Sequence, residues 1–100
     1  MSRYALTPLA KADIFEIWSY IAADNESAAD RVEAAIYEAC ALLAEGHFLG
    51  HTRIDLTPRP LRFWGVSRYP NYMIVYRPET TPLQIIAGGE RAPRAADLRC

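Results

Sequence analysis

Arginine and aromatic side chains are the residues of this chain best suited to chemistry or recognition, and eight of the ten arginines lie in its second half. Ten of the eleven cationic residues are arginines. A guanidinium group can pair with a carboxylate or a phosphate through two hydrogen bonds, and it can stack on an aromatic ring. Five aromatic residues and three arginines occur in one stretch, residues 61–78, which reads LRFWGVSRYPNYMIVYRP. This stretch is therefore a candidate core wall, nucleic-acid surface or catalytic face.

The charge is distributed unevenly along the chain, although the net charge of the 100 residues is only −1. Residues 1–50 carry three basic and eight acidic side chains, a net charge of −5, whereas residues 51–100 carry eight arginines and four acidic side chains, a net charge of +4. With a sequence pI of about 6.1, steering toward nucleic acid is weak outside the arginine-rich half. The alternative is that these arginines are ordinary solvated residues of strands and loops.

The composition predicts one soluble domain that comprises residues 1–100. Hydrophobic residues make up 51% of the chain and charged residues 23%, and no run of 18 apolar residues could span a membrane. The N-terminal sequence MSRYALTP lacks the apolar segment of a secretion signal. We therefore expect a cytoplasmic protein.

The cysteines and histidines predict no disulfide, metal site or cofactor. Cys40 lies within a helical apolar pattern, where it is expected to be a small core residue, and Cys100 is the last residue. His47 and His51 are four residues apart in a glycine-containing loop, and no second pair of metal ligands lies nearby in the sequence.

A first strand is predicted in residues 1–7, followed by a helix. Thr7 is a residue type that caps helices, and Pro8 suits the first helical position. Apolar residues then recur at helical spacing to about Asp24.

A second helix follows after a very short link and completes an antiparallel helical hairpin over residues 8–45. Ser27, with Asp30 three positions later, resembles a capping box at its start. Gly46 is expected to end it.

The remaining regular structure is predicted to be a three-stranded antiparallel meander over residues 61–87, after a loop. Its strands are expected at residues 61–68, 72–77 and 83–87. If residues 69–71 form the hairpin loop, Trp64 lies opposite Tyr76. The tail, residues 88–100, is polar and is expected to be irregular.

These elements together predict an α+β fold. The N-terminal strand and the antiparallel two-helix hairpin pack on one face of a small, mostly antiparallel sheet, which the first strand joins after the chain has passed through the helices. Because only one face is covered, we expect the strand hairpin to have one apolar side and one mixed side.

The chain resembles the RelE/ParE superfamily of toxins from type II toxin–antitoxin systems, and it is more similar to the ParE branch. The resemblance covers residues 4 to about 87. The first strand and helix correspond to YALTPLAKADIFEIWSYIAADN, with the Ala-x-x-Asp-aliphatic-x-x-Ile run that starts at Ala10. The second helix and its loop, with Gly50 and Arg53, correspond to SAADRVEAAIYEACALLAEGHFLGHTR, and the strand hairpin to LRFWGVSRYPNYMIVYRP.

The resemblance implies a small toxin that forms a hetero-oligomer with a cognate antitoxin. The antitoxin's acidic, amphipathic C-terminal segment wraps over the toxin, and its N-terminal domain binds DNA, which this chain alone does not. ParE-like members inhibit DNA gyrase through protein–protein contact, whereas RelE-like members cleave messenger RNA on the ribosome. Because the fold is shared, the function has to be argued from the site.

The end of the chain departs from the family pattern. The last strand of the family usually runs into a His-Gly-Ala-Arg-Asp-Leu-like sequence, but this chain reads IIAGGERAPRAADLRC and has no histidine there. Arg91, or Arg94 with Asp97, is the available substitute for the Arg-Asp pair. An inactive relic of a toxin is therefore kept as an alternative.

The ribonuclease alternative needs a group that takes the proton of the 2′-hydroxyl, and cations that hold the phosphate. The candidate residues are His51 as the base, with Arg53, Arg62 and Arg91 as cations. Arginine itself is a poor base because its pKa is above 12. No tyrosine follows Tyr76. The sequence thus supplies charge stabilisation but little proton transfer, so gyrase inhibition is favoured over catalysis.

An antitoxin or target surface is predicted instead on the arginine-rich half, where aromatic anchors can be buried and arginines can pair with carboxylates. The candidate binding residues are Arg53, Arg59, Arg62, Trp64, Arg68, Tyr69, Tyr72, Arg77, Arg91 and Arg94. We expect Arg62→Ala to weaken partner contact without unfolding the protein. The alternative is that Trp64 and Tyr76 are core residues.

Overall fold

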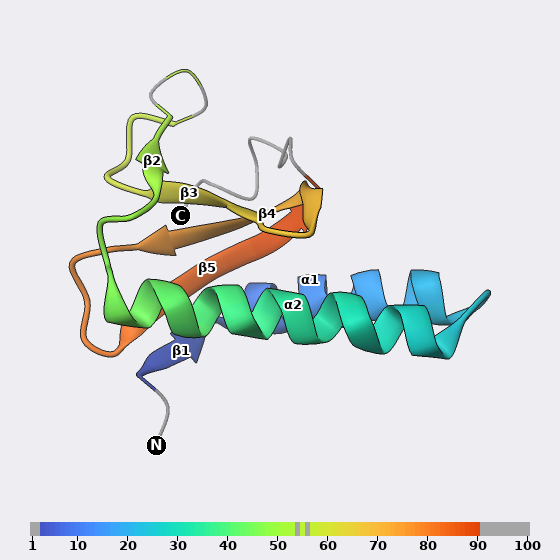
Figure 1. The fold of residues 1–100 in the computed structure, drawn as a ribbon. Coiled ribbons are helices and arrows are strands. Elements are labelled where there is room, and N and C mark those ends of the chain that lie inside the picture. The colour runs from blue at the N-terminus through green and yellow to red at the C-terminus, as the bar shows by residue number, and fades with distance from the viewer. Residues whose placement is uncertain (1–2, 54, 56, 91–100) are drawn as a thin grey trace.

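A five-stranded sheet with two helices on one face forms the structure, a computed structural model that describes residues 3–53, 55 and 57–90 (Figure 1). The elements are β1 (Tyr4–Leu6), α1 (Pro8–Ala22), α2 (Glu26–Glu45), β2 (His51–Thr52), β3 (Arg62–Val66), β4 (Tyr69–Arg77) and β5 (Leu83–Glu90). The strand order is β1-β5-β4-β3-β2. The predicted α+β fold is confirmed. None of the helices in this part of the chain is both long enough and apolar enough to cross a membrane.

The two helices start at side-chain caps, one of which the sequence analysis misplaced. The Thr7 hydroxyl accepts a hydrogen bond from the amide of Ala10 at 3.1 Å, as expected for the cap of α1. The second cap is Asn25, whose side chain accepts from the amide of Ala28 at 3.0 Å. The capping box at Ser27 is therefore wrong. Asn25 is already extended and supplies its oxygen two residues earlier, which leaves Ser27 in the first turn.

The helical hairpin packs below the sheet and extends past its end (Figure 1). Small residues on both helices, including Ala10, Ala29 and Ala39, are buried between the elements. Near the far end of the hairpin the indole of Trp18 donates a hydrogen bond to Asp30 at 2.9 Å, which ties α1 to α2. Gly46 ends α2 as predicted.

The sheet is larger than the predicted meander. Strand β1 pairs in parallel with β5 at one edge, and the other neighbouring strands are antiparallel. Strand β2 lies within the segment predicted to be a loop, and it pairs with the first two residues of β3. Strand β5 runs on to Glu90, so the irregular tail predicted from residue 88 is wrong for residues 88–90. Residues 91–100 lie outside the described part of the chain.

The register of the β3–β4 hairpin also differs from the prediction. The turn is at residues 67–68, and β4 already begins at Tyr69. Trp64 therefore pairs with Ile74 and Arg62 pairs with Tyr76, with an irregularity between Gly65 and Val66. A shift of two residues preserves which side chains share a face, because side chains alternate with a period of two.

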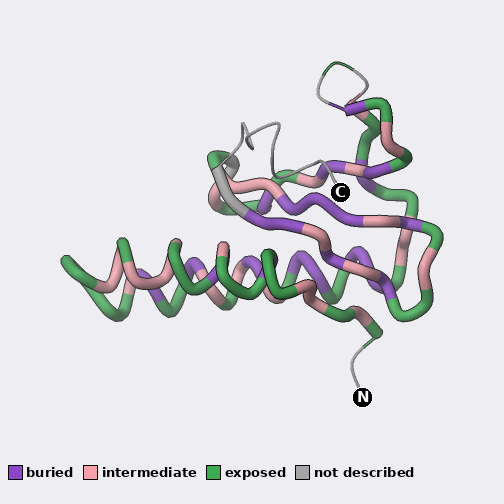
Figure 2. The backbone as a smooth tube through the Cα atoms, turned by 180° about the vertical axis from the view of Figure 1, so that it is seen from behind, coloured by how far each residue is buried: buried purple, intermediate pink, exposed green. Residues whose placement is uncertain are grey.

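Both faces of the sheet carry apolar clusters. On the helix side the core contains Tyr76, Ile74 and residues of both helices; Figure 2 shows buried residues along the central strands and along the helix surfaces that face them. Burial raises the pKa of the Cys40 thiol in this core to about 12. The other face is occupied by a second cluster, made of Leu61, Phe63, Val75 and Ala87.

Candidate protein-binding surfaces

Arg62, the first residue of β3, is held by the loop that follows α2. Its Nη1 donates hydrogen bonds to the carbonyl oxygen of Gly50 at 2.7 Å and, more weakly, to that of Phe48 at 3.4 Å. Its guanidinium carbon lies 5.0 Å from the centre of the Phe48 ring, within the range of a cation–π contact. Arg62 therefore both organises this loop and carries a charge beside an aromatic ring.

The same loop is bound to β4 by a buried tyrosine. The amide of Gly50 donates to the hydroxyl of Tyr76 at 2.8 Å. Burial raises the pKa of Tyr76, while the hydrogen bond from Gly50 and the charge of Arg62 oppose that rise. Tyr76 is thus a core residue, as the alternative interpretation had it, with a hydroxyl that positions the loop.

Arg53 is engaged by its own loop. Its Nε and Nη2 donate to the two carboxylate oxygens of Asp55 at 3.0 and 2.8 Å, a bidentate ion pair at the surface. The hydrogen bonds from Arg53 lower the pKa of Asp55. A partner of this protein would have to compete with Asp55 for Arg53, which makes this arginine a weaker candidate than the sequence suggested.

Arg59 and Arg77 are both half-buried, in different parts of the fold. Arg59 lies in the loop before β3, where its amide donates to the Thr57 hydroxyl at 3.2 Å. Arg77 lies at the end of β4, opposite Gln84, and its Nε is buried without a hydrogen-bond partner among the described residues.

The turn end of the β3–β4 hairpin brings several candidates together. Trp64, Tyr69 and Tyr72 are half-buried and pack against the helix-side core. Arg68 is exposed in the turn, and it makes no hydrogen bond or ion pair with the described residues. Its guanidinium is therefore available to a partner at the turn, directly before the half-buried Tyr69 in the chain.

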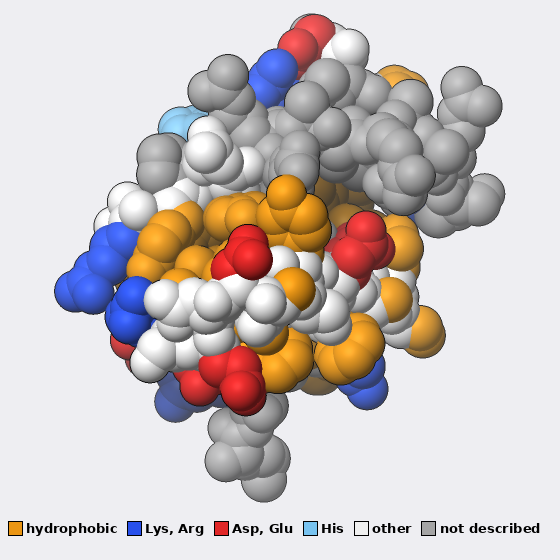
Figure 3. All heavy atoms as spheres, turned by 90° about the vertical axis from the view of Figure 1, so that its right-hand side faces the viewer, with side chains coloured by type: hydrophobic (Ala, Val, Ile, Leu, Met, Phe, Trp, Pro, Cys, Tyr) orange, Lys and Arg blue, Asp and Glu red, His pale blue; other side chains and the backbone are white. Residues whose placement is uncertain are grey.

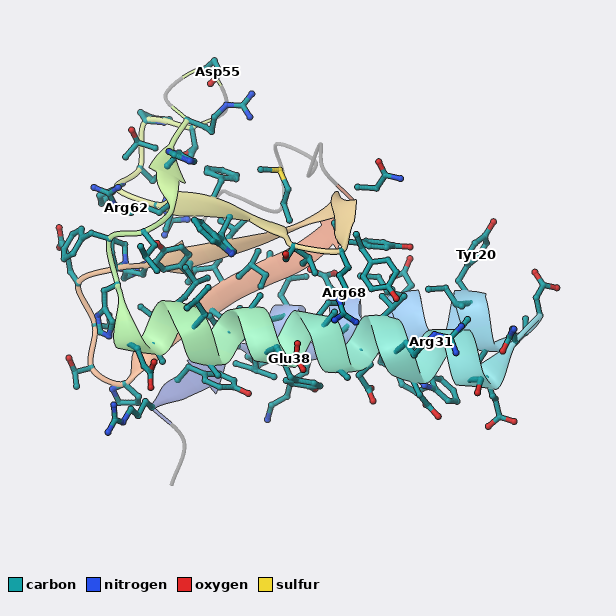
Figure 4. The ribbon with its side chains drawn as sticks, viewed as in Figure 1. Tyr20, Arg31, Glu38, Asp55, Arg62 and Arg68 are labelled. Carbon is teal, nitrogen blue, oxygen red and sulfur yellow. The ribbon has the colours of Figure 1, made fainter. Side chains whose placement is uncertain are left out.

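Arg31 of α2 adds a residue that the sequence analysis did not select. It is exposed, and Figure 4 places it on the same side of α2 as Arg68. Figure 3 shows hydrophobic side chains in a band above the end of the helical hairpin, with basic side chains at one edge of the band. We define the tip surface by the residues Arg31, Trp64, Arg68, Tyr69 and Tyr72. Helical spacing in the sequence could not identify Arg31, because which side of α2 faces the same way as Arg68 depends on the tertiary fold.

The proposed ribonuclease residues are not assembled in the described part of the chain. In the β2–β3 pairing Thr52 lies opposite Arg62, whereas His51 lies opposite Phe63. Directly opposed residues share a sheet face and adjacent residues take opposite faces. His51 and Arg62 therefore project to different sides of the sheet. Arg91 and Arg94 lie outside the described residues.

Large exposed apolar residues are the second feature that the sequence analysis missed. Leu42, Phe48 and Leu49 are exposed at the end of α2 and in the loop after it, and Phe15 and Tyr20 are exposed on α1. Their exposure gives no signal in the sequence, because Leu42 belongs to the same apolar pattern as its buried neighbour Leu43. Among the described residues no three His, Cys, Asp or Glu side chains gather to hold a metal ion.

These features describe an α+β domain with candidate protein-binding surfaces, in which His51 and Arg62 lie on different sides of the sheet. The chain matches the family model of the ParE toxin of type II toxin–antitoxin systems, parDE, over residues 4–89. It therefore belongs to the ParE toxin family, in the ParE branch of the RelE/ParE superfamily, and the resemblance found in the sequence is confirmed. No curated protein sequence gives a significant match.

Proposed function

We propose that this ParE-family toxin acts in the cytoplasm by inhibiting DNA gyrase through protein–protein contact. The observation that carries this proposal is the separation of His51 from Arg62 across the sheet, which leaves Arg62 without His51 as a neighbouring base. Cations alone can bind a phosphate, but the attack of a 2′-hydroxyl also needs a proton acceptor within hydrogen-bond reach. Contact with a protein target needs no such group.

We further propose that the cognate antitoxin binds the tip surface. Half-buried aromatic rings next to exposed arginines fit an acidic, amphipathic segment, since the rings provide anchors and the guanidinium groups pair with carboxylates. The unpaired state of Arg68 supports this assignment, because no carboxylate among the described residues competes for it. A segment that becomes ordered on the toxin would bury the band of hydrophobic side chains seen in Figure 3.

Reversing the charge at Arg68 should weaken antitoxin binding. With Arg68→Glu we expect the antitoxin dissociation constant to rise at least about tenfold, equivalent to about 1.4 kcal/mol, because the new carboxylate repels an acidic segment. Isothermal titration calorimetry would measure this change. Lys11→Glu, at an exposed cation of α1, is the matched control and should change the constant by less than about twofold. Equal effects of the two variants would reject the tip surface and leave only a general effect of net charge.

The target assignment is tested by expression of the chain without its antitoxin. We expect growth arrest with signs of DNA damage, and inhibition of gyrase supercoiling by the purified protein, because the proposed action is direct contact. Supercoiling assays and mapping of messenger RNA ends on stalled ribosomes would be run in parallel. Normal supercoiling together with messenger RNA cleavage on the ribosome would establish the ribonuclease alternative instead. Absence of both effects, with no growth arrest, would identify an inactive relic.

A further inference from the structure

The loop of residues 46–50 carries large apolar side chains into solvent. Phe48 is 61% exposed and Leu49 is 45% exposed, and Leu42, in the last turns of α2, is 46% exposed. Leu49 packs back onto Gly46, where an added Cβ would lie only 2.8 Å from its Cδ1. We define the loop surface by the residues Leu42, Phe48, Leu49 and Arg62. Single exposed apolar residues are ordinary, but a group of them marks a contact surface.

The loop that carries this surface is fixed at both ends. The Gly46 amide donates to the carbonyl oxygens of Leu42 and Leu43, and the Leu49 amide donates back to Gly46, all at 3.1 Å. In addition, Nδ1 of His47 lies 3.0 Å from the carbonyl oxygen of Pro78.

The end of the loop is fixed more strongly. Gly50 is bound through its amide by Tyr76 and through its carbonyl by Arg62, and the guanidinium of Arg62 also covers one face of the Phe48 ring. An apolar side chain held in this way loses little conformational entropy on binding, which is the condition under which buried area contributes most to affinity.

Arg62 adds a specific polar requirement to the loop surface. All of its hydrogen bonds within the described residues come from Nη1. Its Nε and Nη2 make no hydrogen bond with the described residues, and Arg62 is only half-buried, so these two nitrogen atoms are left to donate to a carboxylate of a partner. The partner that complements this surface presents an apolar pocket for Phe48 and an acidic side chain at the edge of that pocket.

We propose that the loop surface is the part of this toxin that contacts its protein target, and that the target is a folded protein with such a pocket. A projecting, immobilised ring requires a concave partner, and concave pockets belong to folded proteins rather than to a segment that becomes ordered on the toxin. The loop surface also lies apart from the tip surface, since Arg62 and Arg68 are at opposite ends of the strand hairpin (Figure 4). This inference rests on the proposed action through protein contact.

The test compares Phe48→Ser with Phe15→Ser, a matched change at a phenylalanine of α1 that is 68% exposed. At equal protein levels, Phe48→Ser should relieve growth arrest and raise the concentration needed for half-inhibition of gyrase at least about tenfold, because it removes the anchor. Its antitoxin dissociation constant should stay within about twofold of wild type, and its unfolding midpoint should not change. Phe15→Ser should behave as wild type, and Phe48→Leu should retain most of the toxicity.

Full toxicity of Phe48→Ser, or an equal loss of antitoxin binding, would overturn the inference. Failure of the gyrase assignment is distinguishable from this outcome. A wild-type chain that arrests growth without inhibiting supercoiling has another target, and the growth-arrest series then still reports whether Phe48 contacts it. A wild-type chain that neither arrests growth nor inhibits supercoiling would overturn both the proposed function and this inference.

Discussion

Replacing Phe63 with alanine should lower the free energy of unfolding by about 3–5 kcal/mol. Phe63 is 1% exposed and belongs to the apolar cluster on the sheet face that turns away from the helices. Truncation removes the transfer free energy of the ring and leaves a cavity lined by Leu61, Val75 and Ala87. Because small domains are stable by only about 5–15 kcal/mol, this loss is a large part of the total. Chemical denaturation followed by circular dichroism would measure it.

Phe15→Ala is the matched control for this prediction. The side chain of Phe15 lies on the solvent side of α1, so we expect its truncation to change the free energy of unfolding by less than about 0.5 kcal/mol. If the two variants lowered the free energy of unfolding by the same amount, the second cluster would not stabilise the fold, and its stability would come from the core on the helix side alone.

The helices were predictable because their signals are local. Thr7 and Pro8 mark the start of α1, Gly46 marks the end of α2, and apolar residues repeat at helical spacing between these points. The one error, Ser27 in place of Asn25, involves two residue types that both cap helices well. The choice between them depends on where the chain leaves the extended conformation, which composition does not determine.

The sheet was harder to predict because its pairing joins distant residues. Strand β2 has only two residues and exists through its pairing with Arg62 and Phe63. The second apolar face did leave a signal in the sequence. Leu61 and Phe63 lie at odd positions and Trp64 and Val66 at even ones, so apolar residues occur on both faces of the strand.

For the candidate surfaces, the sequence indicated which residue types could bind a partner, but not which groups of the fold each of them contacts. The sequence offered Arg53, Arg62 and Arg68 as equivalent cations. In the fold Arg53 pairs with Asp55, Arg62 binds the loop after α2, and Arg68 is exposed. The separation of His51 from Arg62 depends on the register of a two-residue strand. Such a register follows from tertiary packing, so no reading of the sequence could have decided it.

Gly50→Ala should lower the free energy of unfolding by about 1–3 kcal/mol, and it should also reduce toxicity. A Cβ at Gly50 would lie 2.7 Å from the Tyr76 hydroxyl oxygen and 2.9 Å from the carbonyl oxygen of Phe63. The second atom belongs to the backbone of β3 and cannot rotate away, so the loop itself has to move. That movement breaks the hydrogen bond between Gly50 and Tyr76 and displaces the loop surface. Denaturation and growth-arrest assays would measure the two effects.

Gly65→Ala provides the control, because it makes the same chemical change in the neighbouring strand. An added Cβ at Gly65 meets no atom within 4 Å, and none of the described glycines has a positive φ, so neither contact nor backbone strain opposes alanine there. We expect Gly65→Ala to be neutral or to stabilise the protein by about 0.5–1 kcal/mol, through the lower entropy of the unfolded chain. If Gly50→Ala were equally neutral, the loop would tolerate displacement. Tyr76 and Arg62 would then not fix the position of Phe48, and the rigidity on which the target contact depends would be absent.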